Sequence, residues 1–473
     1  MSGCVADYFR CREEDVPILQ KAQVAEDVGY FRFAANVLYG GYCGPQVAKS
    51  PSDVLRDAFE DTVLENGQVT LPFNLNQVVD CLREERYAVA LSEQPGGWGV
   101  MSRAYYLLRP LMSVAFRKHL QRLHLKGWKD KTFPHWPVDR TVDNVMGRLL
   151  LLSLRASRRE SIPFIWFWPD GTRNCAVMTH DVETAVGRDF CGKLMDIDES
   201  YGVTSSFHVV PEERYEVTQE FLNSITGRGF EVGVQDLNHD GLLFQDREQF
   251  KERVARINGY GRQWKASGFR AGVLYRKQEW FGDFEFSYDS SIPNVAHLDP
   301  QHGGCCTVMP FFIGNLVELP VTATQDYSLF HILGDYSLNL WKWQMELIME
   351  KHGLMNFIIH PDYIIGPREQ AVYRDLLGYI AQLREQKGTW VAAPVEVNRW
   401  WRQRAQLQLV ETPDGLQIRG SGSERASIAY ASERDGELVL TLNSPGAARE
   451  HTQRIDVGDG MRPVRSALSA SPN

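Results

Sequence analysis

The sequence predicts an α/β fold: a (β/α) barrel preceded by a mainly helical region and followed by a small antiparallel β module. Short apolar runs alternate with helical segments between residues 161 and 404. Eight such runs within about 240 residues is the repeat typical of a (β/α) barrel. After residue 405, apolar residues recur at period two between glycine-containing turns. The chain is therefore divided into residues 1–160, 161–404 and 405–473.

The expected strands of the barrel are short and apolar. They are Cys175–Thr179, Ser205–Val210, Phe230–Val234, Gly268–Arg270, Phe286–Tyr288, Leu316–Leu319, Met355–Ile359 and Trp390–Ala393. The helices expected between them are Arg188–Tyr201, Thr218–Arg228, Gln249–Tyr260, Leu338–His352 and Glu369–Gln386. Three of these helices precede a glycine, a residue that often ends a helix in the left-handed conformation. In the N-terminal region, apolar residues at helical spacing predict a helix over Phe73–Tyr87.

Composition excludes several classes of protein. The 473 residues include 51 Lys and Arg against 60 Asp and Glu, a net charge of −9, which argues against a general nucleic-acid binder. No apolar run reaches the ~18 to 20 residues of a membrane-spanning helix, and the polar N-terminus does not resemble a secretory signal. The 8 cysteines form no Cys-x-x-Cys pair, which is typical of reduced thiols. We therefore expect a cytoplasmic protein.

The segment 101–131 is basic, in contrast to the net negative charge of the whole chain. It contains eight Lys and Arg but one acid, Asp130, with aromatic residues such as Tyr105 and Trp128 between them. One interpretation is a solvated basic helix packed on its neighbour. The other is a surface for anionic lipid headgroups or an anionic glycan carrier, which would place the protein at the inner face of the membrane.

Polar side chains recur where the predicted strands end, which is where reactive groups collect in a parallel barrel. They are His180, Asp181, Glu183, Gln235, Asp236, His239, Asp240, Arg270, Asp289, Glu318, His360 and Asp362. Each alone has a structural explanation: Asp289 can cap a turn, and Arg270 can form an ion pair. Their joint occurrence at successive strand ends is difficult to explain by packing, and it predicts a single site.

These motifs resemble those of the polysaccharide deacetylases, or NodB-homology domains, over about residues 170–400. MTHDVE is similar to the first motif of that family, GVQDLNH to the second, GFRAG to the third and FIIHP to the last. FSYDSS is similar to a further segment common in the family. The resemblance implies hydrolysis of an N-acetyl group on a sugar by a divalent metal, with zinc the most expected ion.

The resemblance also implies roles for individual residues. Asp181 takes the position of the general base, His360 that of the general acid, and Arg270 would orient the base. The implied metal ligands are His239, Glu183, Gln235 and Asp181. In the alternative arrangement, Asp181 is only a ligand and another group is the base. The remaining strand-end residues are assigned to the substrate, and they are Asp289, Glu318, Asp240, Asp362 and His180.

Two departures from the family pattern concern the metal. Val182 stands where the first motif usually has a second acid, and Glu183 follows one residue later. Gln235 stands at the first position of the expected His-x-x-x-His pair, and its neutral amide oxygen is a poorer zinc donor than imidazole. His180, Asp236 or Asp240 are candidates to compensate for the missing histidine.

Three hypotheses for function follow. The leading one is a metal-dependent deacetylase of an N-acetylated saccharide, such as an intermediate of surface-glycan assembly. Cys305, Cys306 and the segment 311–331, including His331, are expected to form the wall of its pocket. The second is a barrel that binds a glycan or a partner without turnover, as Gln235 suggests. The third is hydrolysis of another C–N bond, in a cyclic imide or an amide.

Overall fold

The computed structural model describes residues 3–21, 27–44, 47–88, 125, 127–442 and 453–455. Its contacts divide the chain into two compact units. The first comprises residues 1–91, 140–171 and 403–473, and the second comprises residues 92–139 and 172–402. The units therefore do not follow the three consecutive blocks expected from the sequence. The reason is that β6 (Ser161–Ile165), expected to begin the barrel, pairs antiparallel with β18 (Ile428–Arg434) of the C-terminal module.

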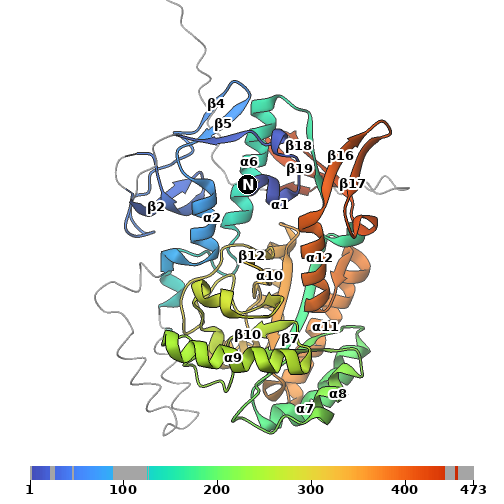
Figure 1. The fold of residues 1–473 in the computed structure, drawn as a ribbon. Coiled ribbons are helices and arrows are strands. Elements are labelled where there is room, and N and C mark those ends of the chain that lie inside the picture. The colour runs from blue at the N-terminus through green and yellow to red at the C-terminus, as the bar shows by residue number, and fades with distance from the viewer. Residues whose placement is uncertain are drawn as a thin grey trace, which may run out of the picture. The chain divides into compact units, whose positions relative to one another are not determined.

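The second unit is built on a nine-stranded sheet (Figure 1). Its strands are β7 (Asn174–Val182), β8 (Ser206–Val209), β9 (Glu231–Gln235), β10 (Gly268–Arg270), β11 (Tyr288–Asp289), β12 (Phe311–Ile313), β13 (Leu316–Glu318), β14 (Leu354–Ile359) and β15 (Thr389–Val391). All eight predicted strands are present, and they are parallel to their neighbours. The ninth, β12, was not predicted and runs antiparallel to β13. All nine residues of β7 are buried, as expected for a strand covered on both faces.

The barrel closes between β13 and β14 without a β-ladder. The chain that follows β13 passes beside β14, where the backbone N–H of Ala323 donates to the carbonyl oxygen of Asn356 at 3.1 Å. The buried side-chain amide of Asn356 donates to the carbonyl oxygens of Leu319 and Pro320 and to the hydroxyl of Ser290, at 2.9, 3.1 and 2.9 Å. The hydroxyl of Thr322 also donates to the carbonyl oxygen of Leu354, so side chains make most of the hydrogen bonds at this seam.

Helices cover the outer face of the parallel sheet. They are α7 (Ala185–Ser200), α8 (Gln219–Thr226), α9 (Arg247–Trp264), α10 (Asn339–Met349), α11 (Pro367–Lys387) and α12 (Pro394–Gln406), whose last residues belong to the first unit. The outward residues of β7, such as Met178 and Val182, pack against α7, α8, α10 and α11 in one apolar core, and α9 packs in a second one. Gly202 and Gly229 end their helices with φ of 64° and 84°, as predicted. After α10 the left-handed residue is His352 rather than Gly353.

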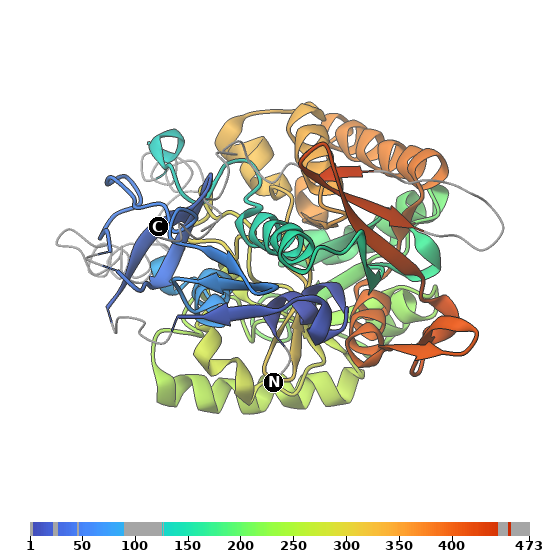
Figure 2. The same cartoon turned by 90° about the horizontal axis from the view of Figure 1, so that it is seen from above.

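The first unit contains more β-structure than the sequence suggested. Residues 3–88 contribute α1 (Cys4–Phe9), α2 (Leu75–Arg83), β1 (Ile18–Gln20), β2 (Val28–Phe33), β3 (Asn36–Gly41), β4 (Val63–Glu65) and β5 (Gln68–Leu71). The remaining elements are α6 (Thr141–Ser157), β16 (Gln408–Thr412), β17 (Gly415–Arg419), β19 (Glu437–Leu442) and β20 (Gln453–Ile455). Helix α6 lies along β18 and β19 (Figure 2). The predicted helix at residues 73–87 is α2, capped by Asn74, which accepts from the N–H of Gln77 at 3.0 Å.

Most of the basic segment 101–131 lies outside the described residues; at its end, Trp128–Asp130 forms a short 3-10 helix. Among the described helices, none has both the length and the apolar character that a membrane crossing requires. All eight cysteines have free thiols, as expected.

Candidate active site

The register of the parallel strands brings the predicted motifs together at one end of the sheet. Asp181 of β7 lies beside His208 of β8. Gln235 of β9 lies beside Arg270 of β10. His360 follows β14, which pairs with the other edge of β7. Because these strands are parallel, the residues that end them meet at the same edge.

Asp181 is held by charge and by a side-chain amide. Its Oδ2 lies 3.6 Å from Nη1 of Arg270 and accepts from Nε2 of Gln235 at 3.3 Å. Arg270 is fully buried, and it donates to the hydroxyls of Thr179 and Ser290 at 3.0 and 3.2 Å. Burial raises the pKa of Asp181 above its ordinary value, although Arg270 and His360 oppose the shift. The guanidinium therefore fixes this carboxylate and partly offsets the cost of burying it.

Glu183 is the centre of the cluster. Its Oε1 lies 2.7 Å from Nε2 of His239, 3.5 Å from Nε2 of His360 and 3.0 Å from Nε2 of Gln235. Burial alone would raise the pKa of Glu183, but the two imidazoles outweigh burial and hold this pKa well below its usual range. The acid that stands one residue beyond the family position thus occupies the middle of the site.

His360 is fixed by an aspartate that the sequence analysis did not identify. Asp326 is fully buried; its Oδ1 lies 2.7 Å from Nδ1 of His360, and its Oδ2 accepts from the backbone N–H of His360 at 2.7 Å. Burial lowers the pKa of His360, but Asp326 and Glu183 outweigh it, so the net pKa lies well above the ordinary value. This arrangement keeps a proton on the ring and turns Nε2 toward Glu183.

The loop after β9 positions His239 through strained backbone. Asp236 and His239 both adopt left-handed conformations, with φ of 51° and 56°. Such angles are uncommon outside glycine and tend to cluster at functional sites. The backbone N–H of Asp236 donates to the carbonyl oxygen of Arg270 at 2.8 Å. A Cβ on Gly272 would come within 2.4 Å of the Asp236 carboxylate, so glycine is needed for the loop to approach.

The donors of the cluster fit a divalent ion. Asp181, Glu183 and His360 each offer a ligand atom, and these atoms lie within 4.8 Å of one another. Oδ1 of Asp181, Oε1 of Gln235 and Nδ1 of His239 are buried without a hydrogen-bond partner. Turning the Gln235 amide by 180° would bring its oxygen close to both carboxylates. Oxygen and imidazole ligands of this kind suit zinc and similar ions.

Three residues assigned to the substrate make their closest contacts outside the cluster, although Asp362 is near enough to interact electrostatically with His360 and Glu183. His180 faces the helices and bonds through Nε2 to Asp198 at 2.9 Å. Asp240 pairs with Arg253 at 2.7 Å. Asp362 lies against the first turn of α7, where a Cβ on Gly187 would meet its carboxylate at 3.4 Å. The structure therefore does not bring these three into contact with Glu183.

Asp289 and Glu318, also assigned to the substrate, form a pair of buried carboxyl groups on β11 and β13. The two residues are neighbours in register. Asp289 accepts from the hydroxyl and the N–H of Ser291, and Glu318 accepts from the N–H of Ile292 at 3.0 Å. Burial raises the pKa of both groups, and for Glu318 the nearby Asp289 raises it further. The pair therefore favours sharing one proton, which leaves it a single negative charge close to Arg270.

His208 is a second residue that the sequence analysis missed. It lies in the middle of the predicted strand at 205–210, and its Nδ1 is 4.0 Å from Oδ1 of Asp181. Its side chain is fully buried, and neither ring nitrogen has a hydrogen-bond partner. Burial, and then Arg270, lower its pKa well below the ordinary value, so the imidazole is neutral. The sequence signal that could have identified it is a polar residue within a largely apolar predicted strand.

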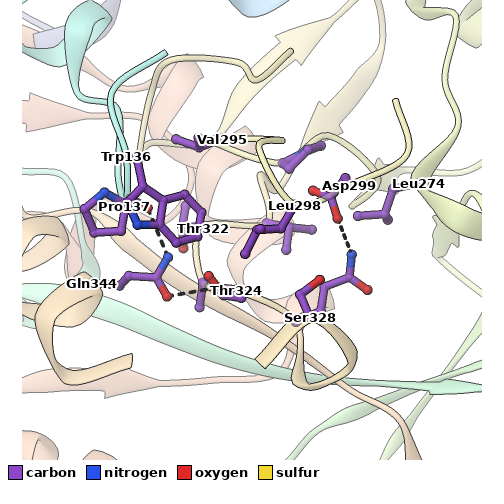
Figure 3. A pocket seen from close by; sticks show the side chains of 14 residues that line it. Trp136, Pro137, Leu274, Val295, Leu298, Asp299, Thr322, Thr324, Ser328 and Gln344 are labelled. Carbon is purple, nitrogen blue, oxygen red and sulfur yellow. Dashed lines mark hydrogen bonds between the residues drawn. The ribbon is translucent and has the colours of Figure 1, made fainter. Parts of the chain in front are cut away.

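A small cavity is lined by residues from the segments before and after β13 and by Trp136 (Figure 3). Its lining includes Trp136 and Leu274 together with Asp299, Gln325 and Ser328. Gln325 donates to Asp299 at 2.8 Å and directly precedes Asp326. Leu274 also packs with Val321 and Ile358, and Ile358 lies two residues before His360. The chain segment that lines this cavity therefore also carries Asp326, which contacts His360.

The pocket wall expected from the sequence is partly different. Cys305 belongs to an apolar core around β9, β10 and α9, and Cys306 is also buried; neither lines this pocket. The ring of His331 contacts that of Tyr363 with centroids 5.0 Å apart, and Tyr363 contacts His360 at 4.8 Å. His331 thus lies near His360 through one intervening ring.

Comparisons with known proteins give likenesses among solved structures. A structure assigned to the polysaccharide deacetylases, from Mycobacterium smegmatis, is 19% identical and covers 50% of this chain and 93% of its own, with a TM-score of 0.40. One from Pseudomonas aeruginosa PAO1, assigned likewise, is 12% identical over 50% of this chain and 93% of its own, with a TM-score of 0.38. The Puue allantoinase is 10% identical and covers 50% of this chain and 92% of its own, with a TM-score of 0.39. No family model and no curated protein matches the chain.

Proposed function

We propose that this chain is a metal-dependent hydrolase that removes N-acetyl groups from a saccharide. The observation that carries the proposal is the convergence of Asp181, Glu183 and His360, whose ligand atoms lie within 4.8 Å of one another. Both ends of this trio are supported by a buried charge, Arg270 beside Asp181 and Asp326 beside His360. When bound, a divalent ion supplies Lewis-acid polarisation of the acetyl carbonyl and a bound water of lowered pKa.

The residues that would hold the ion are Asp181, Glu183, Gln235 through its amide oxygen, and His239. His360 is assigned to proton transfer instead, although its Nε2 belongs to the converging trio. The reason is Asp326, which accepts from both the ring Nδ1 and the backbone N–H of His360. A carboxylate on Nδ1 stabilises the protonated ring and leaves Nε2 to face the substrate.

The protein residues then divide the proton transfers between them. Asp181 takes a proton from the attacking water, and Arg270 keeps its carboxylate from rotating. His360 delivers a proton through Nε2 to the nitrogen of the departing amine. The cleavage yields acetate and a free amino sugar.

The test is acetate release from N-acetylated oligosaccharides by the purified chain, before and after removal of divalent ions by a chelator. We expect activity that is lost on chelation and returns with added Zn²⁺. The variants His239→Ala and His360→Ala separate the two imidazoles. The first should weaken Zn²⁺ binding in calorimetry, and the second should retain Zn²⁺ but lose kcat.

Other outcomes identify the competing hypotheses. Saccharide binding without acetate release, by both the native chain and a Gln235→His variant, would indicate a binding protein. Hydrolysis of cyclic imides or small amides without action on acetylated sugars would indicate another C–N hydrolase. Action on a cytoplasmic glycan intermediate, and contact of residues 101–131 with anionic lipid, stay predictions.

A further inference from the structure

His208 is the most unusual buried group near the site. Its side chain is completely excluded from solvent, and both ring nitrogens lack a hydrogen-bond partner. Buried polar groups in folded proteins nearly always have partners, because an unmade hydrogen bond destabilises the folded state. A leucine of similar volume would avoid that destabilisation. The imidazole is therefore a feature that stability alone does not explain.

The sequence around His208 makes room for this ring. Gly233 is its neighbour in register on β9, and a Cβ at that position would lie 2.5 Å from Cδ2 of the imidazole. No side chain larger than hydrogen fits there without moving the ring. The β9 glycine thus accommodates the imidazole on the inner face of the sheet.

The imidazole is directed at the carboxylate that the proposed reaction uses as its base. Nδ1 of His208 lies 4.0 Å from Oδ1 of Asp181, and this oxygen also lacks a hydrogen-bond partner. The other oxygen, Oδ2, faces Gln235 and Arg270. The separation is too long for a hydrogen bond, but a movement of about 1 Å would form one. Hydrogen bonds at catalytic groups are often long in the free enzyme and tighten with substrate.

We propose that His208 is a positioning residue for Asp181, holding Oδ1 from within the barrel while Arg270 holds Oδ2. A carboxylate oxygen has two lone pairs, so Oδ1 can accept from Nδ1–H of His208 and still take a proton from water. The imidazole acts through Asp181 and does not touch the substrate. This inference rests on the proposed function for its effect on catalysis.

The experiment compares His208→Leu with His208→Asn and with the control Asp198→Asn, in α7, whose carboxylate contacts His180 on the outer face of the same sheet. For His208→Leu we expect kcat to fall at least 10-fold with KM changed less than about 3-fold, and Zn²⁺ affinity to fall about 10-fold. The melting temperature should equal or exceed that of the native chain. His208→Asn, which retains an N–H donor, should recover part of kcat. Asp198→Asn should lower the melting temperature and leave kcat unchanged.

A structural role for His208 gives the opposite pattern. If His208→Leu lowers the melting temperature as Asp198→Asn does, and leaves kcat and Zn²⁺ affinity unchanged, the proposal is wrong. Gly233→Ala offers a second route, since it displaces the ring and keeps its chemistry; kcat should fall. Should the native chain release no acetate, the proposed function fails, while the melting temperatures and the Zn²⁺ titration still decide the role of His208.

Discussion

Buried histidines and acids have hydrogen-bond partners on one face of strand β7 and lack some of them on the other. On the outer face, His180 bonds to Asp198, and Asp198 also accepts from Ser205 at 2.6 Å and from Tyr373 at 2.5 Å. On the inner face, Oδ1 of Asp181 and both ring nitrogens of the neighbouring His208 lack a hydrogen-bond partner. Both faces are equally buried, so burial does not distinguish them.

The difference teaches how to separate structural polar groups from functional ones. A network in which every donor and acceptor is satisfied rigidifies the fold and costs stability when it is broken. A set of converging groups left unsatisfied destabilises the fold, and it persists where a reaction requires it. Substitutions on the outer face should therefore change stability, and substitutions on the inner face should change catalysis.

The largest effect is expected at the inner face. Asp181→Asn removes the carboxylate charge but keeps the shape of the side chain, and it should lower kcat/KM for acetate release by about 10³-fold, within the range for loss of a general base. Circular dichroism should show an unchanged fold. Activity within 10-fold of the native chain would show that another residue is the general base.

Asp326→Asn should have the next largest effect. The amide can still contact His360, but it no longer stabilises a proton on the ring, so kcat should fall by about 10²-fold. The bell-shaped dependence of kcat on pH should also shift its alkaline limb to lower pH. This follows because Asp326 raises the pKa of His360 in the native chain. An unchanged pH profile would contradict the assignment of His360 as the proton donor.

A substitution on the outer face should change the stability of the fold and leave catalysis unchanged. Asp198→Ala leaves His180, Ser205 and Tyr373 without their shared acceptor. We expect unfolding in urea to be easier by about 3 kcal/mol, a typical value for breaking a buried charged network. The value of kcat per folded molecule should not change. A loss of kcat in the folded protein would show that the two faces are coupled.

The smallest effect concerns Glu231, at the opposite end of the sheet from the site. Tyr288 and the N–H of Val395 donate to its carboxylate at 2.8 and 3.0 Å, yet burial raises its pKa from 4.5 to about 7. The folded chain thus binds this proton more tightly than the unfolded chain. The stability it contributes is present below pH 4.5 and is lost as pH rises through about 7.

Glu231→Gln tests this dependence, because glutamine keeps an acceptor oxygen but does not titrate. Thermal unfolding measured between pH 5 and pH 8 should show a smaller loss of stability in the variant than in the native chain. Equal slopes in the two proteins would mean that Glu231 does not titrate in this range.

Local pattern alone located most of the fold. The eight barrel strands and the helices between them follow from apolar periodicity and turn residues, which act over a few positions of the chain. Because parallel strands end at one edge, the same pattern also placed Asp181, Glu183, Gln235 and His360 near one another. The sequence also has Gln235 where the resemblance to the deacetylases predicts a histidine.

Tertiary structure decided which polar residues face the site. Every residue of β7 is buried, so apolar residues occupy both of its faces, and the sequence does not show that His180 points to the helices while Asp181 points inward. Asp326 reaches His360 only because the chain after β13 passes beside β14. The pairing of β6 with β18 joins segments more than 260 residues apart. Such contacts depend on how distant segments pack, which no local pattern of residues records.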